Sequence, residues 1–482
     1  MSIQTPDWVK HAVFYQIFPD RFAQSQRVHK PANLEPWNNK PTNNGFKGGD
    51  LLGVAEKLDY LQDLGVNALY LCPIFQSTAN HRYHTQDYLR VDPILGGDAA
   101  FQELLKAAHK RKMKVILDGV FNHASRGFYQ FNHALENGAD SPYVDWFNFQ
   151  GFPVHAYHGK ANYDCWWGIP ALPKFNTNIP AVREYLFKVG EYWIEQGIDG
   201  WRLDVPAEIA DDSFWQEFRN RVKAINPEAY IVGEIWHTAE RWLQGDQFDA
   251  VMNYLFTKAC VGFFADGKID TTLSAGVGYA PVTDLDASGF AYSLNMTLGL
   301  YDRAINEVQM NLLSSHDTAR YLSIVKHDVR ALKLATLCQM TYPGAPSVYY
   351  GDEIGLEGGK DPDCRRAFNW DEQIWNHELR DYMKQCIALR KKYSALRTGD
   401  FRVIYAEGKA VAYYRQLGDE KLIIALNSDT QAATINIVTR EVLPDDAKLK
   451  VIFGNKASYL TANGSLTTLK IPKREGIVLK VI

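Results

Sequence analysis

The sequence predicts an α/β protein: a (β/α)8 TIM barrel that carries an inserted subdomain after its third strand, followed by a C-terminal antiparallel β-sandwich. Strand-like and helix-like segments alternate along most of the chain, a pattern typical of parallel sheets. Several predicted strands end in an acidic residue or a histidine. Because the strand tips of a parallel barrel share one face, these polar residues are expected to converge on one pocket.

Eight segments have the length and apolar composition of buried strands: residues 13–18, 68–71, 114–117, 200–203, 230–232, 250–252, 310–313 and 347–350. Segments with apolar residues at helical spacing connect some of them, at 52–64, 101–111, 182–196 and 214–224. Gly65 is the stop signal of the first of these helices. A doubly wound open sheet is the alternative fold, but no glycine-rich nucleotide loop follows the first strand.

Two regions depart from the alternating pattern. Between the third strand and residue 180, aromatic residues, Asn, His and Pro crowd together, and long loops of this kind are usually functional. We interpret residues 123–179 as an inserted subdomain and residues 1–122 and 180–397 as the barrel. From residue 398 to 482, short β-rich runs separated by turn residues predict the antiparallel sandwich.

Composition narrows the classes of function. The chain of 482 residues has a net charge of −4 with acids and bases interspersed, which favours neither nucleic acid nor an anionic membrane as a partner. We see no secretory signal and no apolar run long enough to span a membrane. The six cysteines are scattered without metal-ligand spacing, which predicts free thiols in the cytoplasm.

Three carboxylates lie at predicted strand tips: Asp204, Glu234 and Asp317. Acid-assisted cleavage of a glycosidic bond through a covalent intermediate uses such a set. Arg202 lies two residues before Asp204, so both side chains point to the same side of a strand, and we expect the guanidinium to lower the pKa of Asp204. Taken singly, such an acid is more often a helix cap, and His123 or His316 a core histidine. The joint placement favours a catalytic site.

Six strings resemble the conserved regions of the α-amylase family of glycoside hydrolases: HRYHTQDY (81–88), DGVFNH (118–123), LPKFN (172–176), GWRLDV (200–205), GEIWH (233–237) and SSHDTAR (314–320). The resemblance covers nearly the whole chain. It implies a barrel with these two additional regions and retaining action on α-glucan oligosaccharides without an organic cofactor. By motif position, it implies Asp204 as nucleophile, Glu234 as general acid and base, and Asp317 as transition-state stabiliser.

The resemblance also implies sugar-binding residues. Tyr83, His123, Arg202 and His316 would surround the reacting sugar, with Tyr83 as its stacking platform. Asp361 and Arg365, within YYGDEIGLEGGKDPDCRR (349–366), would flank the next sugar. Trp236 and His237 would lie toward the acceptor side. For calcium, Asp50 and Asn122 match two ligand positions of the family, although the loop Gln24-Ser25-Gln26-Arg27 is poor in carboxylates.

Within the family, the sequence is similar to the cyclomaltodextrinase, neopullulanase and maltogenic amylase group, which implies cleavage of α-1,4 and some α-1,6 bonds in maltooligosaccharides or cyclodextrins. The alternatives are an α-glucan transglycosylase, a catalytically silent glucan-binding protein, and a sucrose or trehalose isomerase. The barrel begins near residue 12, whereas the group carries an N-terminal β domain that helps form a dimer. We therefore leave the oligomeric state open.

Overall fold

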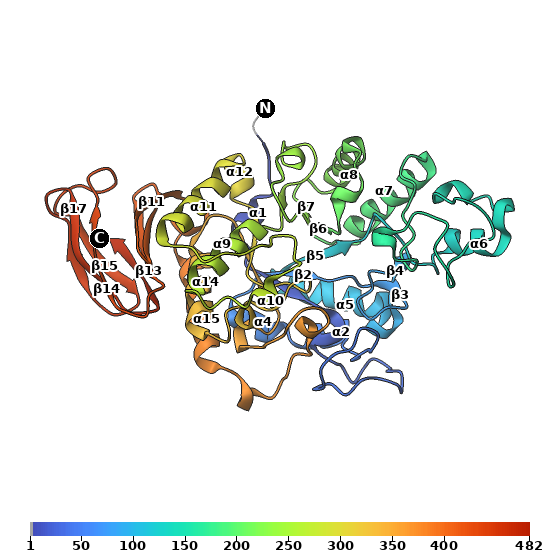
Figure 1. The fold of residues 1–482 in the computed structure, drawn as a ribbon, viewed down its shortest axis with the longest axis horizontal. Helices are drawn as coiled ribbons and strands as arrows, with labels where there is room; N and C mark the ends of the chain where they lie inside the picture. Colours follow the sequence, from blue (N-terminus) through green and yellow to red (C-terminus); the bar gives the residue numbers. More distant parts are fainter. Residues whose placement is uncertain (1–2) are drawn as a thin grey trace.

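The computed structural model describes residues 3–482, and its centre is a barrel of eight parallel strands (Figure 1). The strands are β1 (Phe14–Ile17), β2 (Ala68–Leu71), β5 (Lys114–Gly119), β6 (Gly200–Leu203), β7 (Tyr230–Gly233), β8 (Ala250–Val251), β9 (Met310–Leu312) and β10 (Ala345–Tyr349). They pair in the order β8-β7-β6-β5-β2-β1-β10-β9, and a parallel bridge between Met252 and Met310 joins the two ends. The predicted barrel is thereby confirmed.

Nearly every barrel-strand residue is buried, which explains why these segments are apolar rather than alternating. The longer helices around them are α5 (Gly97–Lys110), α7 (Pro180–Glu195), α8 (Asp212–Ile225), α9 (Tyr254–Phe264), α11 (Ala287–Gly299), α14 (Val329–Thr341) and α15 (His377–Lys392). Shorter ones are α1 (Asp7–Lys10), α2 (Pro19–Phe22), α10 (Thr271–Ser274), α12 (Arg303–Asn306), α13 (Tyr321–Ile324) and α16 (Ala395–Thr398).

The helix predicted over 52–64 is two helices, α3 (Leu51–Glu56) and α4 (Leu58–Leu64). Lys57 lies between them with a φ of −104° and a ψ of 6°, outside the helical range. The apolar spacing continues through this break, so periodicity alone does not reveal it. The stop at Gly65 is confirmed: it adopts a φ of 102°, a conformation that glycine reaches without a Cβ clash.

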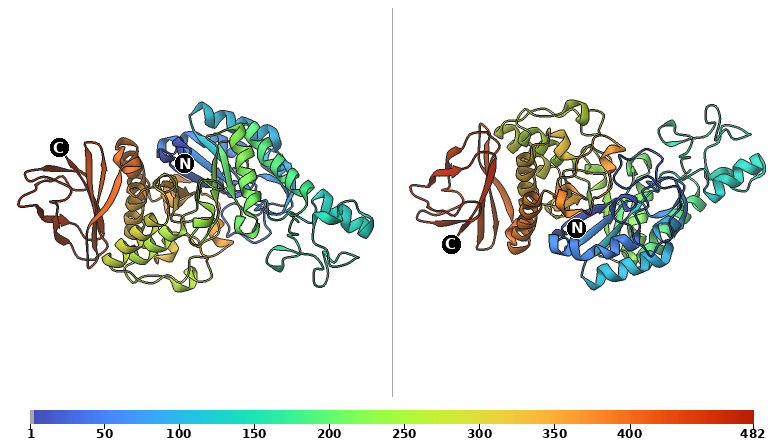
Figure 2. Two further views of the ribbon diagram at one scale, coloured as in Figure 1. Left: turned by 90° about the horizontal axis from the view of Figure 1, so that it is seen from above. Right: turned by 90° about the horizontal axis from the view of Figure 1, so that it is seen from below.

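After β5 the chain leaves the barrel and returns at α7. This insertion holds α6 (Tyr129–Asn137) and short 3-10 turns, including Val144–Trp146 and Trp166–Gly168. Isolated bridges, His123 with Lys174 and Phe147 with Phe175, connect its two ends. Before it, a hairpin of β3 (Phe75–Ser77) and β4 (Thr85–Val91) follows the second barrel strand. Figure 2 shows α6 and the C-terminal sheets at opposite ends of the molecule.

The C-terminal region is a sandwich of two antiparallel sheets. One has six strands, β11 (Asp400–Glu407), β12 (Ala410–Leu417), β13 (Glu420–Asn427), β15 (Lys448–Phe453), β16 (Ser458–Leu460) and β18 (Glu475–Val481); the other pairs β14 (Ala433–Val438) with β17 (Ser465–Ile471). One face of the larger sheet packs on the smaller sheet, and the other joins the barrel core through Val411, Tyr413 and Ile424. In residues 3–482, no helix is long and apolar enough to cross a membrane.

Candidate active site

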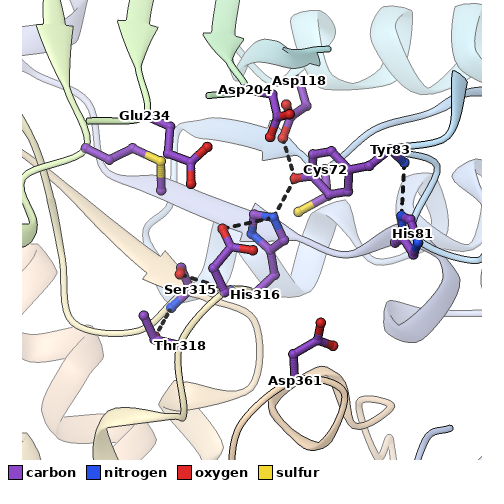
Figure 3. Close-up of polar contacts among 12 residues, drawn as sticks. Cys72, His81, Tyr83, Asp118, Asp204, Glu234, Ser315, His316, Thr318 and Asp361 are labelled. Atoms are coloured by element: carbon purple, nitrogen blue, oxygen red, sulfur yellow. Dashed lines mark hydrogen bonds and ion pairs between the residues drawn. The ribbon is translucent and has the colours of Figure 1, made fainter. Parts of the chain in front are cut away.

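Four carboxyl groups converge on the guanidinium of Arg202, at the C-terminal ends of the barrel strands. Its Nη1 lies 2.9 Å from Asp118 Oδ1 and 2.9 Å from Asp204 Oδ1, and its Nη2 lies 2.9 Å from Glu234 Oε2 and 3.8 Å from Asp317 Oδ2. Figure 3 shows the side chains of Asp118, Asp204 and Glu234 pointing toward one space. The three carboxylates that the sequence places at separate strand tips therefore share one binding partner.

The backbone around Asp204 explains part of this geometry. Gly200 opens β6 where a Cβ would lie 2.2 Å from the Tyr230 carbonyl oxygen, so the glycine permits the close approach of β7. Val205, directly after Asp204, has a φ of 35°, which is rare for a β-branched residue. In this conformation its N–H donates to Glu234 Oε2 at 3.0 Å. Backbone strain of this kind occurs where the surrounding structure holds functional groups in place.

The charges of this cluster correct one expectation. Burial raises the pKa of Asp204 well above its usual value, against the lowering effect of Arg202, and the negative charge of Glu234 raises it further. Burial and Glu234 likewise raise the pKa of Asp317 to about 7, with Arg202 and Arg365 opposing. The predicted lowering of the Asp204 pKa is therefore wrong, because burial and the neighbouring carboxyl groups outweigh the effect of Arg202. Since these acids lie close together, their titrations are linked and are not properties of single residues.

A hydrogen-bonded chain fixes His316 beside this cluster. Gln16 Nε2 donates to His316 Nδ1 at 2.7 Å, so His316 Nε2 carries the proton and donates to the Tyr83 hydroxyl. Tyr83 in turn donates to Asp118 Oδ2 at 2.9 Å, and Tyr70 donates to the same oxygen at 2.7 Å. The Tyr83 and His316 rings are parallel within 1°. Burial lowers the pKa of His316 well below its usual value, which keeps the ring neutral.

His123 and two tryptophans form an aromatic stack that leads from the pocket to the surface. Trp166 stacks on His123 with ring centroids 5.3 Å apart, and Trp167 stacks on Trp166 at 4.4 Å. Trp167 is 79% exposed. Burial lowers the pKa of His123 to about 3, and its Nε2 is buried without a hydrogen-bond partner among the described residues. That atom is therefore available to a ligand.

Trp236 and His237 behave differently from each other. The indole Nε1 of Trp236 donates to Glu234 Oε1 at 3.0 Å, and its ring stacks on Tyr254 at 3.7 Å. Trp236 therefore contacts the Glu234 carboxyl group directly. The prediction placed Trp236 toward the acceptor sugar and did not foresee this contact. His237 is exposed, and its recorded contacts are local: the Thr238 carbonyl oxygen at 2.8 Å from Nδ1, and the Trp242 ring.

Asp361 and Arg365 form an ion pair at the edge of the cluster. Arg365 Nη1 lies 3.0 Å from Asp361 Oδ1, and Nη2 lies 3.6 Å from Asp317 Oδ1. Arg365 Nε donates to the His316 carbonyl oxygen at 2.8 Å, so this side chain is fixed against the loop that carries Asp317. Asp361 is half exposed, and its side chain points toward the side of the site where His316 lies (Figure 3). The structure thus brings both predicted residues to the site.

The residues around Asp50 do not fit a calcium site. Asp50 is fully buried, and its Oδ1 accepts the Gly53 N–H at 2.7 Å as the N-cap of α3. Its Oδ2 accepts the Ser25 N–H at 2.8 Å and the Lys30 ammonium at 2.7 Å. Calcium needs six to eight oxygen ligands, whereas this carboxylate is surrounded by nitrogen donors. The expected role of Asp50 as a ligand is corrected, because Lys30 supplies the positive charge there.

Asn122 offers one amide oxygen, Oδ1, which is buried without a partner in residues 3–482. Within the same residues, the one cluster of three candidate metal ligands is Cys72, Asp118 and His316. Its chemistry does not suit a metal, since burial raises the pKa of the Cys72 thiol and Arg202 already binds Asp118. No cluster of three acidic ligands within the described residues therefore accompanies Asn122.

Sequence reasoning missed three residues of the site. Gln16 lies inside β1, where a polar residue in a buried strand was the available signal. Tyr70, in β2, reads as an ordinary core aromatic. Trp166 belongs to the aromatic-rich insertion. The composition of this insertion indicated a functional region, but it did not single out Trp166 among the aromatic residues. All three act through neighbours that are distant in sequence, so only the assembled barrel identifies them.

Comparison with known proteins agrees with this geometry. Residues 16–398 match the family model "Alpha amylase, catalytic domain", and residues 399–479 match "Alpha-amylase C-terminal domain". A cyclomaltodextrinase of Geobacillus thermopakistaniensis is 46% identical over 90% of this chain and 71% of its own length. An intracellular maltogenic amylase of Bacillus subtilis is 41% identical over 88% of this chain and 69% of its own.

A debranching enzyme of Nostoc punctiforme provides a similar solved structure. It is 50% identical to this chain, and the alignment covers 99% of this chain and 100% of that one with a TM-score of 0.91. Its match, unlike that of the two longer relatives, extends over both proteins completely. The family models together cover nearly all of the described residues, and this chain belongs to the α-amylase family of glycoside hydrolases.

Proposed function

We propose that this protein hydrolyses α-glucosidic bonds in short or cyclic maltooligosaccharides by a retaining double displacement. The observation that carries the proposal is the pair Asp204 and Glu234, on adjacent strand tips and each 2.9 Å from the same guanidinium. Retaining enzymes need two carboxyl groups close together on opposite sides of the scissile bond. A third carboxyl group, Asp317, lies beside this pair, 3.8 Å from the same guanidinium.

In the first step, a carboxylate oxygen of Asp204 attacks the anomeric carbon while Glu234 protonates the leaving glycosidic oxygen, so the glycosidic bond breaks as the glycosyl ester forms. In the second step, Glu234 removes a proton from water, the water oxygen attacks the same carbon, and the bond to Asp204 breaks. Arg202 holds both carboxyl groups in place. The proton that Glu234 gives to the leaving oxygen in the first step is replaced by the one that it removes from water in the second.

The other residues have roles that follow from their positions. Tyr83 offers its ring to the apolar face of the reacting sugar, and His123 Nε2 binds one of its hydroxyl groups. His316 binds a hydroxyl group of the same sugar when its Nε2 leaves the Tyr83 hydroxyl. Asp317 stabilises the positive charge that develops on the ring, and its own hydrogen bonds to the sugar strengthen as that charge grows. Asp361 and Arg365 bind the next sugar. Trp236 and His237 lie toward the acceptor, where Trp236 also holds the Glu234 carboxyl group.

The relatives support the substrate class. One is a cyclomaltodextrinase, one a maltogenic amylase and one a debranching enzyme, so we propose α-1,4 bonds of maltooligosaccharides and cyclodextrins as the main target, with some cleavage of α-1,6 bonds. The name of the Bacillus subtilis relative supports a cytoplasmic location. The reaction as proposed uses carboxyl groups and water alone and needs no organic cofactor, and Lys30 takes the place of a calcium ion at Asp50.

The test is a time course on β-cyclodextrin, maltotriose, pullulan and starch, with the anomeric configuration of the first products followed by NMR. We expect the α-anomer to form first, before mutarotation; the β-anomer first would contradict double displacement. Asp204→Asn should lower kcat by about 10³-fold or more while the melting temperature shows an intact fold. Glu217→Gln, which changes a half-exposed carboxylate on α8 that pairs with Arg221, is the matched control and should retain normal activity.

A further inference from the structure

A cavity of about 390 Å³ lies between the start of α14 and the C-terminal sheet, and none of its lining residues belongs to the active site. Five of its lining side chains are cationic and one is anionic: Lys268, Lys326, Asp328, Arg330, Lys473 and Arg474. The whole chain carries a net charge of −4, so this concentration of positive charge is not a property of a basic protein. Cationic side chains that line one cavity repel each other, and a bound anion reduces this repulsion.

The single carboxylate of the cavity is already occupied. Asp328 Oδ2 receives Arg474 Nη2 at 2.7 Å and Lys268 Nζ at 3.5 Å, while its Oδ1 caps α14 by accepting the Arg330 and Ala331 N–H groups. Across residues 3–482, the side chains of Lys326, Arg330 and Lys473 form no ion pair with a carboxylate. The cavity therefore holds more positive charge than its own acid neutralises.

The buried side chain of Arg474 forms one side of the cavity and is held in place by hydrogen bonds. This side chain is 95% buried, and Nη1 donates to the Ser428 carbonyl oxygen at 2.7 Å. Its Nε is buried without a hydrogen-bond partner in the described chain, an arrangement that is costly unless a ligand is bound. The N-terminus of α14, a helix of 13 residues, adds the positive end of its dipole at the same place.

We propose that this cavity binds a phosphate group, either as free phosphate or carried by a sugar phosphate. A phosphate dianion presents several oxygens to Arg and Lys donors at once, which matches a lining with one buried guanidinium and four exposed cations. The volume of the cavity falls in the range of small-ligand sites, so a sugar ring can accompany the phosphate. The site joins the barrel helix α14 to the turn before β18, and binding would link the two domains.

The test measures binding of inorganic phosphate and of glucose 6-phosphate to the full chain by isothermal titration calorimetry, at an ionic strength held constant with sodium chloride. Binding is measured directly because phosphate also stabilises proteins without binding to them. The variant is Arg330→Glu combined with Lys473→Glu, both exposed in the free protein. The matched control is Lys106→Glu combined with Lys448→Glu, two exposed lysines outside the cavity that make the same change in net charge.

We expect saturable binding to the wild type and to the control, and at least a tenfold loss of affinity in the cavity variant. Tighter binding of glucose 6-phosphate than of inorganic phosphate would identify a sugar phosphate as the ligand, and equal affinity would identify the phosphate group alone. The proposal is overturned if neither ligand saturates the wild type, or if the control variant loses as much affinity as the cavity variant. Hydrolysis of maltotriose by the same variants separates this result from the proposed enzymatic function.

Discussion

Arg202 is the residue on which the site depends, because it is the shared cation of a group of acids. Asp118, Asp204 and Glu234 each lie 2.9 Å from one of its terminal nitrogens. Arg202 and the more distant Arg365 carry two positive charges, which cannot balance these three acids and Asp317 when every one is ionised. Part of the repulsion therefore remains in the folded protein, as is common where stability is traded for function.

Asp317→Asn should increase the free energy of unfolding, and the increase should become larger as pH rises. In the folded protein the pKa of Asp317 is raised to about 7, whereas an unfolded Asp titrates near 3.9. Between these values the native state holds a proton that the unfolded state has lost, so the free energy of unfolding of the wild type falls as pH rises to about 7. In the Asn variant the free energy of unfolding does not fall in this way. In the wild type the fall reaches up to about 4 kcal/mol.

The measurement is urea unfolding of the wild type and Asp317→Asn at pH 5 and pH 8, together with kcat. The variant should be more stable than the wild type at pH 8 by a larger margin than at pH 5, and nearly inactive at both. A difference in stability that does not change between the two pH values would show that Asp317 titrates normally in the fold.

Trp236→Phe should impair the acid step selectively. The substitution removes the 3.0 Å hydrogen bond from Nε1 to Glu234 Oε1 but leaves a ring to stack on Tyr254. We expect kcat on maltotriose to fall about tenfold or more, because a misplaced general acid is inefficient. α-Maltosyl fluoride, whose leaving group needs no proton, should be much less affected.

Tyr279→Phe is the control for this variant, since Tyr279 stacks in the same aromatic group and its hydroxyl has no partner in residues 3–482. It should behave as the wild type on both substrates. Equal losses on maltotriose and the fluoride in Trp236→Phe would mean that Trp236 acts in substrate binding alone.

At the level of elements, the loop between α2 and α3 is held by an internal cation. Lys30 reaches the buried Asp50, which caps α3 and also accepts the Ser25 N–H. Lys30→Met should lower the free energy of unfolding by about 2 kcal/mol or more, because it leaves a buried carboxylate without a cation. Lys188→Met, on the exposed face of α7, should change it by less than about 0.5 kcal/mol.

Calcium and a chelator complete this test. The melting temperature of the wild type should not respond to EDTA or to added calcium, and calcium should not rescue Lys30→Met, because backbone N–H groups surround the carboxylate. A fall in the melting temperature of the wild type with EDTA would show that a metal ion, rather than Lys30, stabilises this loop.

The elements show which features sequence patterns determine. The strand predicted over 68–71 has the same bounds in the structure, because a short apolar run buried on both faces has few alternatives. The predicted helix over 52–64 is interrupted at Lys57, since the break leaves the apolar spacing unchanged. The β3–β4 hairpin, which carries Tyr83 in its loop, was not predicted, because its side chains are of mixed burial.

For the site, sequence patterns predicted that the acids at the strand tips converge, but they did not predict contacts that depend on packing. Asp204 and Glu234 follow apolar runs, and the barrel brings such tips together. The role of Asp50 could not be predicted, because the Lys30 contact depends on the course of a loop. The pKa of Asp204 depends on burial and on three further acids, none of which its neighbouring Arg202 reveals.

At the level of the whole molecule, the barrel and the C-terminal sandwich are parts of one folding unit. The larger sheet contributes Val411, Tyr413, Leu422, Ile424 and Val478 to the core of the barrel. Separation of the two would expose this apolar face to water, at a cost of about 25 cal/mol for each Å². We therefore expect the wild type to unfold in urea in a single transition when followed by tryptophan fluorescence and by circular dichroism.

Arg415→Leu should weaken this junction without changing the chemistry. Arg415, on β12, is fully buried and binds only carbonyl oxygens: Nη1 contacts Thr341 and Leu396 (3.1 Å), Nη2 contacts Gly399 at 3.0 Å, and Nε contacts Asp400 at 3.1 Å. Loss of these donors should lower the free energy of unfolding by about 3 kcal/mol or more. Arg402→Leu, on the exposed face of β11, should cost less than about 1 kcal/mol. Because none of the residues that Arg415 contacts belongs to the active site, kcat at 25 °C should stay unchanged in both variants. Two separate unfolding transitions in the wild type would show instead that the sandwich folds independently of the barrel.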